Sequence, residues 1–312
     1  MSRILAAHLA LIAANLLYGI NYSIAKYPMP ENITPFAFVL IRVVVSGLLF
    51  WLLHALTVRE RIANRDIPLF ILCGLSGVSA NQLMFIGGLN ITTEINASLI
   101  MITTPVLVPF LAYFIIKARV TLLTVIGITL GAIGASWIIV FGQDFTFSSQ
   151  TRAGDLLIFL NAVSYALYLV LAKPLLRKYN PITVIMWTFV LGFPVVFLFG
   201  FPSFVDIAWS SFDWKVWTSI GFVVIGATFL AYLLNVIALA HVNSSVVGIY
   251  IYSQPFIASV VAMAIGSDRL TITKIIAAVL IFTGVMLVSR IGPFRKRSSA
   301  STALTDPSGG DR

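Results

Sequence analysis

The stretch Ile249–Thr271, IYIYSQPFIASVVAMAIGSDRLT, places a proline and a polar cluster inside an otherwise apolar segment. The stretch Ile102–Thr121, ITTPVLVPFLAYFIIKARVT, also has polar residues just before a proline, and it also ends with a basic residue and a threonine. An offset of 150 residues aligns the two stretches without a gap, so the chain repeats itself. Among the identities that this offset aligns are Pro105 with Pro255, Arg119 with Arg269, and Thr121 with Thr271.

The composition places this repeat in lipid rather than in water. Of the 312 residues, 59% are hydrophobic and only 10% are charged, whereas a soluble domain has about 25% charged residues. Apolar segments of about 20 residues, enough to cross a bilayer, follow one another with short connections. We therefore predict an all-α integral membrane protein with ten transmembrane helices. Their expected ranges are about 5–26, 33–56, 67–89, 95–116, 121–141, 155–173, 182–202, 214–239, 243–265 and 273–290.

Each repeat contains five of these spans, and five is an odd number. The two repeats, residues 5–141 and 155–290, must therefore enter the membrane from opposite sides, as inverted-topology repeats do. Such repeats enclose a site near the middle of the bilayer and allow it to open to either side in turn. Residues 291–312 are small and polar, and we expect them to form a disordered cytoplasmic tail.

The basic residues indicate which way the chain sits in the membrane. If the N-terminus is inside, the inside regions hold 14 of the 20 Lys and Arg residues and the outside regions hold 5. The positive-inside rule then favours cytoplasmic termini, and it accounts for the net charge of +9 without a nucleic-acid partner. The inside residues are Arg3, Arg59, Arg61, Arg65, Lys117, Arg119, Lys173, Arg177, Lys178, Arg290, Arg295, Lys296, Arg297 and Arg312, and the outside residues are Lys26, Arg152, Lys215, Arg269 and Lys274.

Four features in a fixed order resemble a known family. They are YGINYSIAK at 18–26, FVLIRVVVSGLLF at 38–50, the prolines of the fourth and ninth spans, and GSDRLT at 266–271. On these features the chain resembles the drug/metabolite transporter superfamily, in particular the bacterial EamA-type permeases, over residues 5–290. The resemblance implies a bacterial inner-membrane exporter of amino acids, metabolites or drug-like compounds with a central cavity. The family's usual Gly-Glu-Arg is replaced here by GSDR, which bears on gating contacts more than on the cargo pocket.

Arg42 lies near the middle of the second span, where a charge is costly and usually functional. No Asp or Glu is expected at that depth. Arg42 therefore either attracts an anionic group of the cargo or bonds to carbonyl groups of the protein, and the sequence leaves both readings open. The lack of a buried acid also argues against a carboxylate proton relay, so we expect facilitated or weakly ion-coupled transport.

Polar and aromatic residues form matching stripes in the first and sixth spans. Asn15, Tyr18 and Tyr22 share one helix face, as do their counterparts in the second repeat. A polar face is costly against lipid, so each stripe faces either another helix or a cavity, and we expect a cavity. The predicted cargo-binding residues are Asn15, Tyr18, Tyr22, Arg42, Asn81, Gln82, Asn161, Tyr165, Tyr168, Tyr232, Asn235, Tyr252 and Gln254.

Prolines interrupt the fourth and ninth spans beside this expected cavity. Pro105 and Pro255 each lack an amide hydrogen and free a backbone carbonyl, which needs a polar neighbour or a water-filled cavity in the membrane. We expect a hinge at each proline. We also assign gating to Lys26 and Glu94, which lie at the outer ends of their helices.

These features predict a secondary transporter that exports amino acids or related metabolites by alternating access. A sugar-phosphate or organic-anion exchanger of the same superfamily is the alternative. An intramembrane protease rests only on GLSG at 74–77, and its serine would need a nearby histidine. We expect no enzymatic activity, no metal or other cofactor and no nucleic-acid partner. The chain is expected to be a monomer, or a homodimer if Gly127 and Gly131 pack between copies rather than internally.

Overall fold

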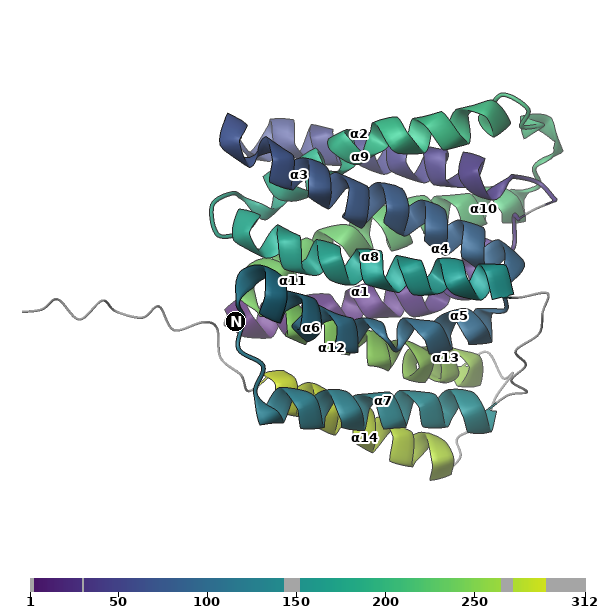
Figure 1. Cartoon of the computed structure of the whole chain (residues 1–312). Helices are drawn as coiled ribbons and strands as arrows, with labels where there is room; N and C mark the ends of the chain where they lie inside the picture. Colours follow the sequence, from purple (N-terminus) through teal and green to yellow (C-terminus); the bar gives the residue numbers. More distant parts are fainter. Residues whose placement is uncertain (1–2, 30, 143–151, 265–271, 290–312) are drawn as a thin grey trace, which may run out of the picture.

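The computed structural model describes residues 3–29, 31–142, 152–264 and 272–289 as a bundle of helices (Figure 1). All regular elements within these residues are helical. The first half contains α1 (Arg3–Lys26), α2 (Pro35–Thr57), η1 (Asn64–Asp66), α3 (Ile67–Gly74), η2 (Leu75–Ser79), α4 (Ala80–Ile91), α5 (Glu94–Met101), α6 (Thr104–Ile116) and α7 (Leu122–Gly142). The second half contains α8 (Arg152–Leu175), α9 (Pro181–Phe204), η3 (Trp209–Ser211), α10 (Trp214–Gly221), η4 (Phe222–Leu230), α11 (Ala231–His241), α12 (Ser244–Ile249), η5 (Tyr250–Tyr252), α13 (Ser253–Ala264) and α14 (Ile272–Ser289).

Helices occur in every predicted spanning range within the described residues. Seven helical segments there are long and apolar enough to cross a bilayer, including the continuous segments Asn64–Ile91 and Trp214–His241. The fifth and tenth spans appear as α7 and α14, whose apolar parts are shorter, and the ninth is divided into α12, η5 and α13. The all-helical membrane fold is thus confirmed, whereas the count of ten crossings stays a prediction. The predicted tail, residues 291–312, and the GSDR motif at 266–269 lie outside the described residues.

Four of the spans are interrupted, and the interruptions are paired between the halves. The third span (α3, η2, α4) and the eighth (α10, η4, α11) each contain a π-helical segment, η2 or η4. The fourth span breaks between α5 and α6 just before Pro105, and the ninth passes through η5 just before Pro255. The interruption expected at each proline is therefore present. Because freed backbone groups are tolerated at membrane depth only against protein or a cavity, these breaks mark the interior of the bundle.

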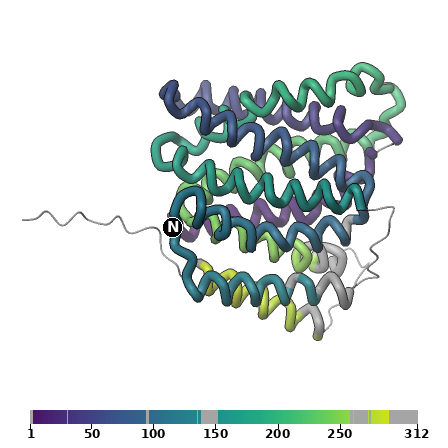
Figure 2. The backbone as a smooth tube through the Cα atoms, in the orientation of Figure 1, coloured from purple at the N-terminus to yellow at the C-terminus, as the bar shows by residue number. Residues whose placement is uncertain are grey.

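Contacts between helix ends show that α1 and α8 run in opposite directions. The Lys26 ammonium, at the end of α1, donates to the backbone oxygen of Thr92 over 2.9 Å. The Thr92 hydroxyl in turn donates to the carboxylate of Asp155, in the first turn of α8. The end of α1 thus lies beside the start of α8, as inverted repeats require. Figure 2 shows that α1 starts and α14 ends at the same side of the bundle.

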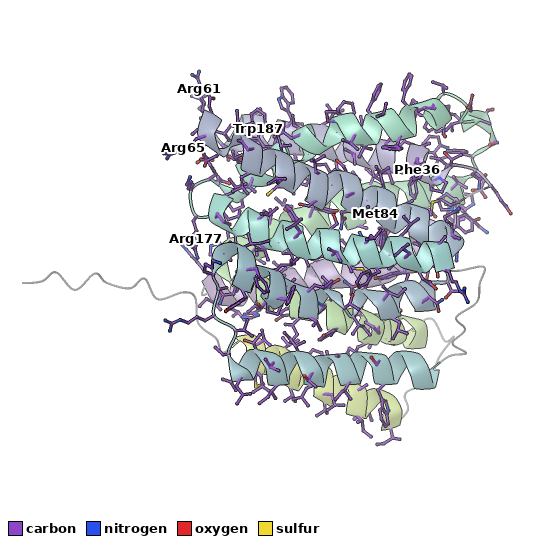
Figure 3. The ribbon with its side chains drawn as sticks, in the orientation of Figure 1. Phe36, Arg61, Arg65, Met84, Arg177 and Trp187 are labelled. Atoms are coloured by element: carbon purple, nitrogen blue, oxygen red, sulfur yellow. The ribbon has the colours of Figure 1, made fainter. Side chains whose placement is uncertain are left out.

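Basic side chains gather at the end of the bundle where α1 starts. Figure 3 places Arg61, Arg65 and Arg177 at this end. Here the Lys178 ammonium forms a 2.8 Å ion pair with the carboxylate of Asp66. This pair joins the connection after α8 to the start of α3, so it ties the second half to the first.

Helices α7 and α14 form a close pair at the edge of the bundle (Figure 1). A Cβ atom added at Gly127 would lie 2.8 Å from the backbone oxygen of Gly284 and 2.7 Å from the side chain of Val288. One added at Gly134 would lie 2.8 Å from the backbone oxygen of Ala277. The glycines of α7 therefore allow internal packing against α14. This motif no longer argues for a homodimer.

The inverted repeat predicts that equivalent positions lie on opposite sides of the membrane. Thr57 ends α2, Asp206 follows α9, and both are exposed. In a Cys73→Ala background, Asp206→Cys should react with a membrane-impermeant maleimide on intact cells. Thr57→Cys should react only after the cells are permeabilised. Reaction of both cysteines from the same side would exclude the inverted repeat.

The close helix pair predicts that even one methyl group at Gly127 destabilises the protein. Gly127→Ala should cost about 1–3 kcal/mol, because the new atom forces α7 away from α14. The change would be measured as a lower melting temperature of the purified protein in detergent. Gly221→Ala is the matched control, since a Cβ atom there meets nothing within 4 Å. An equal fall for both variants would contradict tight packing of α7 on α14.

Candidate functional site

A cavity of about 70 Å³ lies inside the bundle between α1, α4, α8 and α11. Each of these helices contributes polar side chains, for example Tyr18, Gln82, Tyr165 and Asn235 in that order. Two of the helices belong to the first half and two to the second, so the cavity lies between the repeats. At about 30 Å³ for each water molecule, its volume corresponds to roughly two waters. The interior of this apolar bundle therefore contains polar side chains around a cavity.

Arg42, from α2, brings a positive charge to this cavity. The residue is only 4% exposed, and its Nε donates to the hydroxyl of Thr228 over 3.0 Å. The protein thus holds the guanidinium by one nitrogen through a side-chain hydroxyl. A second nitrogen, the buried Nη1, has no protein partner among the described residues.

The π-helical segment η4 fixes the partner of Arg42. The Thr228 hydroxyl, which accepts from Arg42, donates to the backbone oxygen of Val223 over 2.8 Å. The Ser46 hydroxyl of α2 donates to the backbone oxygen of Val224 over 3.2 Å. The widened turn therefore gives its carbonyl groups to side chains that hold α2 against η4. π-Helical segments inside α-helices are frequent at functional sites, and η4 orients the buried charge.

Gln254 joins the two halves along one wall of the cavity. Its Nε2 donates to Oδ1 of Asn15 over 2.9 Å, and its Oε1 accepts from the Tyr22 hydroxyl over 3.3 Å. Helices α1 and α13 approach closely here, because a Cβ atom added at Gly19 would lie 3.3 Å from the backbone oxygen of Gln254. The residue just before Pro255 thus closes the cavity against α1.

A second set of hydrogen bonds crosses between helices around the same cavity. The Tyr232 hydroxyl donates to Oδ1 of Asn81 over 2.9 Å, and Nδ2 of Asn161 donates to the backbone oxygen of Asn81 over 2.7 Å. Nδ2 of Asn235 donates to the Tyr18 hydroxyl over 3.3 Å. Each bond links a helix of one half to a helix of the other. The polar stripes therefore line a cavity and also bond between helices, so the two readings of the sequence both describe the structure.

Three amide oxygens of the lining residues lack a hydrogen-bond partner among the described residues. They are Oδ1 of Asn21, Oε1 of Gln82 and Oδ1 of Asn161. All three residues are at most 3% exposed, and a buried polar atom without a partner is unfavourable by about 1–3 kcal/mol. Together with Nη1 of Arg42 and Nε2 of Gln82, the lining residues hold one cationic donor, one neutral donor and three acceptors that the described protein leaves unsatisfied.

Eleven of the thirteen predicted cargo-binding residues line this cavity. Tyr168 and Tyr252 do not belong to its described lining. The Tyr168 ring packs on Gly77 and the Tyr252 ring packs on Gly131, and both tyrosines are buried there. Their rings fill space left by glycines, which a helix-face argument does not reveal. The residues that do line it are Asn15, Tyr18, Tyr22, Arg42, Asn81, Gln82, Asn161, Tyr165, Tyr232, Asn235 and Gln254.

Five further lining residues were not predicted from the sequence. Asn21 is polar and lies in the first span, so its side chain was a usable signal. The other four are apolar, and in a membrane protein an apolar residue of the cavity looks like one that faces lipid. These additional residues are Asn21, Phe85, Met101, Val247 and Ile251.

The predicted hinge and gate residues lie at the ends of helical segments. Pro105 is in the first turn of α6, and Pro255 is in the first turn of α13. Lys26 lies in the last turn of α1. Glu94 begins α5, and its side chain lies outside what the structure describes. Their roles in gating stay predictions.

The protease interpretation finds no support at its serine. Ser76 lies in η2, and its hydroxyl donates to the backbone oxygen of Leu72 over 2.6 Å. A serine nucleophile instead needs a base such as histidine within hydrogen-bond distance. His8, for comparison, contacts the Tyr250 hydroxyl at 2.8 Å. The helix itself thus holds the Ser76 hydroxyl.

A cavity lined by polar side chains between two inverted halves of an apolar bundle is typical of membrane transporters. The chain matches the EamA-like transporter family twice, over residues 5–140 and over residues 152–290. The chain therefore belongs to the EamA-like transporter family of the drug/metabolite transporter superfamily. Both halves match the same family, as the internal repeat in the sequence requires.

Relatives along most of the chain are also named as transporters. "Uncharacterized transporter YyaM" of Bacillus subtilis is 25% identical over 289 residues, which cover 91% of this chain and 93% of the relative. A protein of Streptantibioticus cattleyicolor named "Probable terminal-alkyne amino-acid exporter" is 27% identical over 245 residues, covering 76% of this chain and 78% of the relative. A solved crystal structure superimposes with a TM-score of 0.70 at 17% identity, covering 92% of this chain and 97% of that one. That likeness shows the shared fold.

The positions of Tyr165 and Tyr168 predict different effects of the same substitution. Tyr165→Ala should raise the KM for cargo by about tenfold, because part of the cavity wall is removed. A tenfold change corresponds to about 1.4 kcal/mol of binding free energy. The melting temperature of this variant should stay nearly unchanged. Tyr168→Ala should lower the melting temperature, because removal of a large buried ring lowers the free energy of unfolding by about 3–5 kcal/mol. The KM of this variant should stay unchanged. Transport kinetics in proteoliposomes and thermal melts in detergent measure the two effects. The reverse result would mean that Tyr168, and not Tyr165, contacts cargo.

Proposed function

We propose that this protein exports amino acids or closely related small metabolites across the bacterial inner membrane by alternating access. The cavity between the two halves is the cargo site, and the inverted repeats expose it to one side and then to the other. The family supports transport. The relative named "Probable terminal-alkyne amino-acid exporter", which is 27% identical, supports the choice of cargo.

The unsatisfied polar atoms of the cavity are the observation that carries this choice. Arg42 offers a cationic donor, and Asn21 and Asn161 offer neutral acceptors. A zwitterion matches both kinds of group, because its carboxylate accepts from the guanidinium and its ammonium donates to the amide oxygens. The apolar residues of the lining, such as Phe85 and Met101, would contact an uncharged side chain.

The sugar-phosphate alternative is favoured by Arg42 alone. A phosphate carries up to two negative charges and is usually bound by several basic groups. The described lining of the cavity contains one basic residue, Arg42. Lys26, in the last turn of α1, does not belong to that lining and donates to the backbone oxygen of Thr92. A carboxylate therefore fits the charge of this cavity better than a phosphate.

The transport is proposed to be facilitated or only weakly coupled to an ion. No Asp or Glu belongs to the described lining of the cavity. Proton-coupled carriers commonly use a membrane carboxylate or histidine for the proton. With a neutral and cationic lining, the concentration gradient of the cargo itself supplies the driving force.

Both termini are proposed to lie in the cytoplasm. Arg61, Arg65 and Arg177 gather at the end of the bundle where α1 starts (Figure 3). The positive-inside rule assigns the end with more Lys and Arg to the cytoplasm. That end is called the inner end below, and the end at which α1 finishes is called the outer end.

Removal of the buried charge tests this proposal. Arg42→Ala should reduce kcat/KM for amino-acid export by about 10- to 100-fold, because a hydrogen bond to a charged group contributes about 1.5–3 kcal/mol. Gln254→Ala, which opens one wall of the cavity, should also reduce flux. Counterflow into proteoliposomes with equal amounts of folded protein measures both. The matched control is Arg61→Ala at the exposed end of the bundle, which should transport normally.

The cargo class is tested in the same proteoliposomes. A panel of neutral amino acids and a panel of phosphorylated sugars are offered separately as counterflow substrates. We expect exchange with the amino acids and none with the sugar phosphates. Exchange with sugar phosphates alone, or full amino-acid flux through folded Arg42→Ala, would contradict the proposed site.

A further inference from the structure

Two lysines, one in each half, bind the backbone at a helix end. Lys26 Nζ, in the last turn of α1, donates to the oxygen of Thr92 over 2.9 Å. Lys173 Nζ, in the last turn of α8, donates to the oxygens of Leu239 and Val242 over 2.5 and 2.6 Å. Thr92 and Val242 are the residues at which α4 and α11 end. An ammonium is favourable there, because the last carbonyls of a helix are unpaired and carry its negative dipole end.

The two contacts lie at opposite ends of the bundle. Helices α1 and α8 run in opposite directions, since the end of α1 and the start of α8 meet at Thr92. The Lys26 contact is therefore at the outer end, and the Lys173 contact is at the inner end. Thr92 and Val242 are also separated by the 150 residues that align the two repeats. One contact is thus the counterpart of the other across the inverted repeat.

Each contact also joins two groups of helices that meet at the cavity. Helix α1 packs mainly on α11 and α13, whereas α4 and α6 pack mainly on α8. The cavity lies between these two groups, because α1 and α11 line one side of it and α4 and α8 line the other. Lys26 reaches from α1 to the end of α4, and Lys173 reaches from α8 to the end of α11. Each lysine therefore connects one group to the other.

The chemistry of these contacts suits a connection that breaks and reforms. Both lysines are half-buried, and each is bound to neutral carbonyl groups. Lys178, by comparison, forms an ion pair with Asp66. Separating an ammonium from a carbonyl leaves no uncompensated buried anion, whereas breaking a buried ion pair does. Water at the opened end can then solvate both the ammonium and the carbonyl.

We propose that Lys26 and Lys173 are alternating latches of the transport cycle. The outer latch, Lys26 with Thr92, opens when the cavity opens outward, and the inner latch, Lys173 with Leu239 and Val242, opens when it opens inward. The inference rests on the proposed alternating access and assigns its gates to named residues. Both latches are formed in this structure, and its cavity of about 70 Å³ is well below the ~300–1,000 Å³ of most ligand pockets. The structure therefore describes a narrow chamber with both lysine contacts formed.

The test measures access to the cavity from each side. Val247, which lines the cavity, is replaced by cysteine in a Cys73→Ala background. Its reaction rate with an impermeant maleimide is followed on intact cells for the outer side and on inside-out vesicles for the inner side. We expect Lys26→Met to raise the outer rate by roughly tenfold or more, and Lys173→Met to do the same for the inner rate, because each loses charged hydrogen bonds that close one end.

Controls separate a latch from a general loss of structure. Lys215→Met removes an exposed lysine on α10 and should change neither rate. Lys26→Gln and Lys173→Gln, which keep a donor, serve if a methionine variant does not fold, and they should show smaller shifts on the same sides. An increase from both sides alike, an increase from the opposite side, or no change in either folded variant would overturn the proposal.

The outcome is independent of the identity of the cargo. If amino acids fail in the counterflow assay but the two labelling rates respond on opposite sides, the latches stand and the cargo proposal fails. If amino acids are transported but the labelling rates do not respond, the cargo proposal stands and the latches fail.

Discussion

Backbone polar groups inside a bilayer must find partners within the protein, and this constraint organises the whole structure. Regular helices meet it by themselves, whereas the breaks before Pro105 and Pro255 and the π-helical segments η2 and η4 do not. Their freed groups are acceptable only in the interior, next to polar side chains or a solvated space. The interruptions therefore lie in the interior, near the cavity. The same helix interruptions supply polar backbone groups and positions at which the helices can bend.

The cavity depends on contributions from both halves. The hydroxyl that holds Arg42 comes from Thr228 of the second half, and the amide that bonds Asn15 comes from Gln254. Each half alone would leave its polar stripe facing lipid, which is unfavourable. Pairing the halves converts two costly faces into one hydrophilic chamber. Recognition of cargo and assembly of the two repeats are therefore carried by the same side chains.

Much of the site could be predicted from the sequence because polar residues are rare in an apolar chain. Asn15, Tyr18 and Asn161 stood out at helical spacing, and the structure places all three at the cavity. Phe85 could not be found this way, because apolar residues meet lipid, protein and cavity with similar composition. Tyr168 was placed at the cavity by its spacing, but its ring packs on Gly77. Only the neighbouring helix decides that.

The sequence by itself determined the membrane class, the helical content and the repeat, because hydropathy and an odd number of spans follow from the order of residues alone. The tertiary structure alone decided which partners meet across the halves. Lys26 and Lys173 are separated by more than a hundred residues, and their targets are backbone carbonyls, which every sequence position supplies. A backbone carbonyl can accept a hydrogen bond whatever its side chain is, so the residue type at that position does not predict the contact. Only the packing of the helices shows which carbonyl each lysine binds.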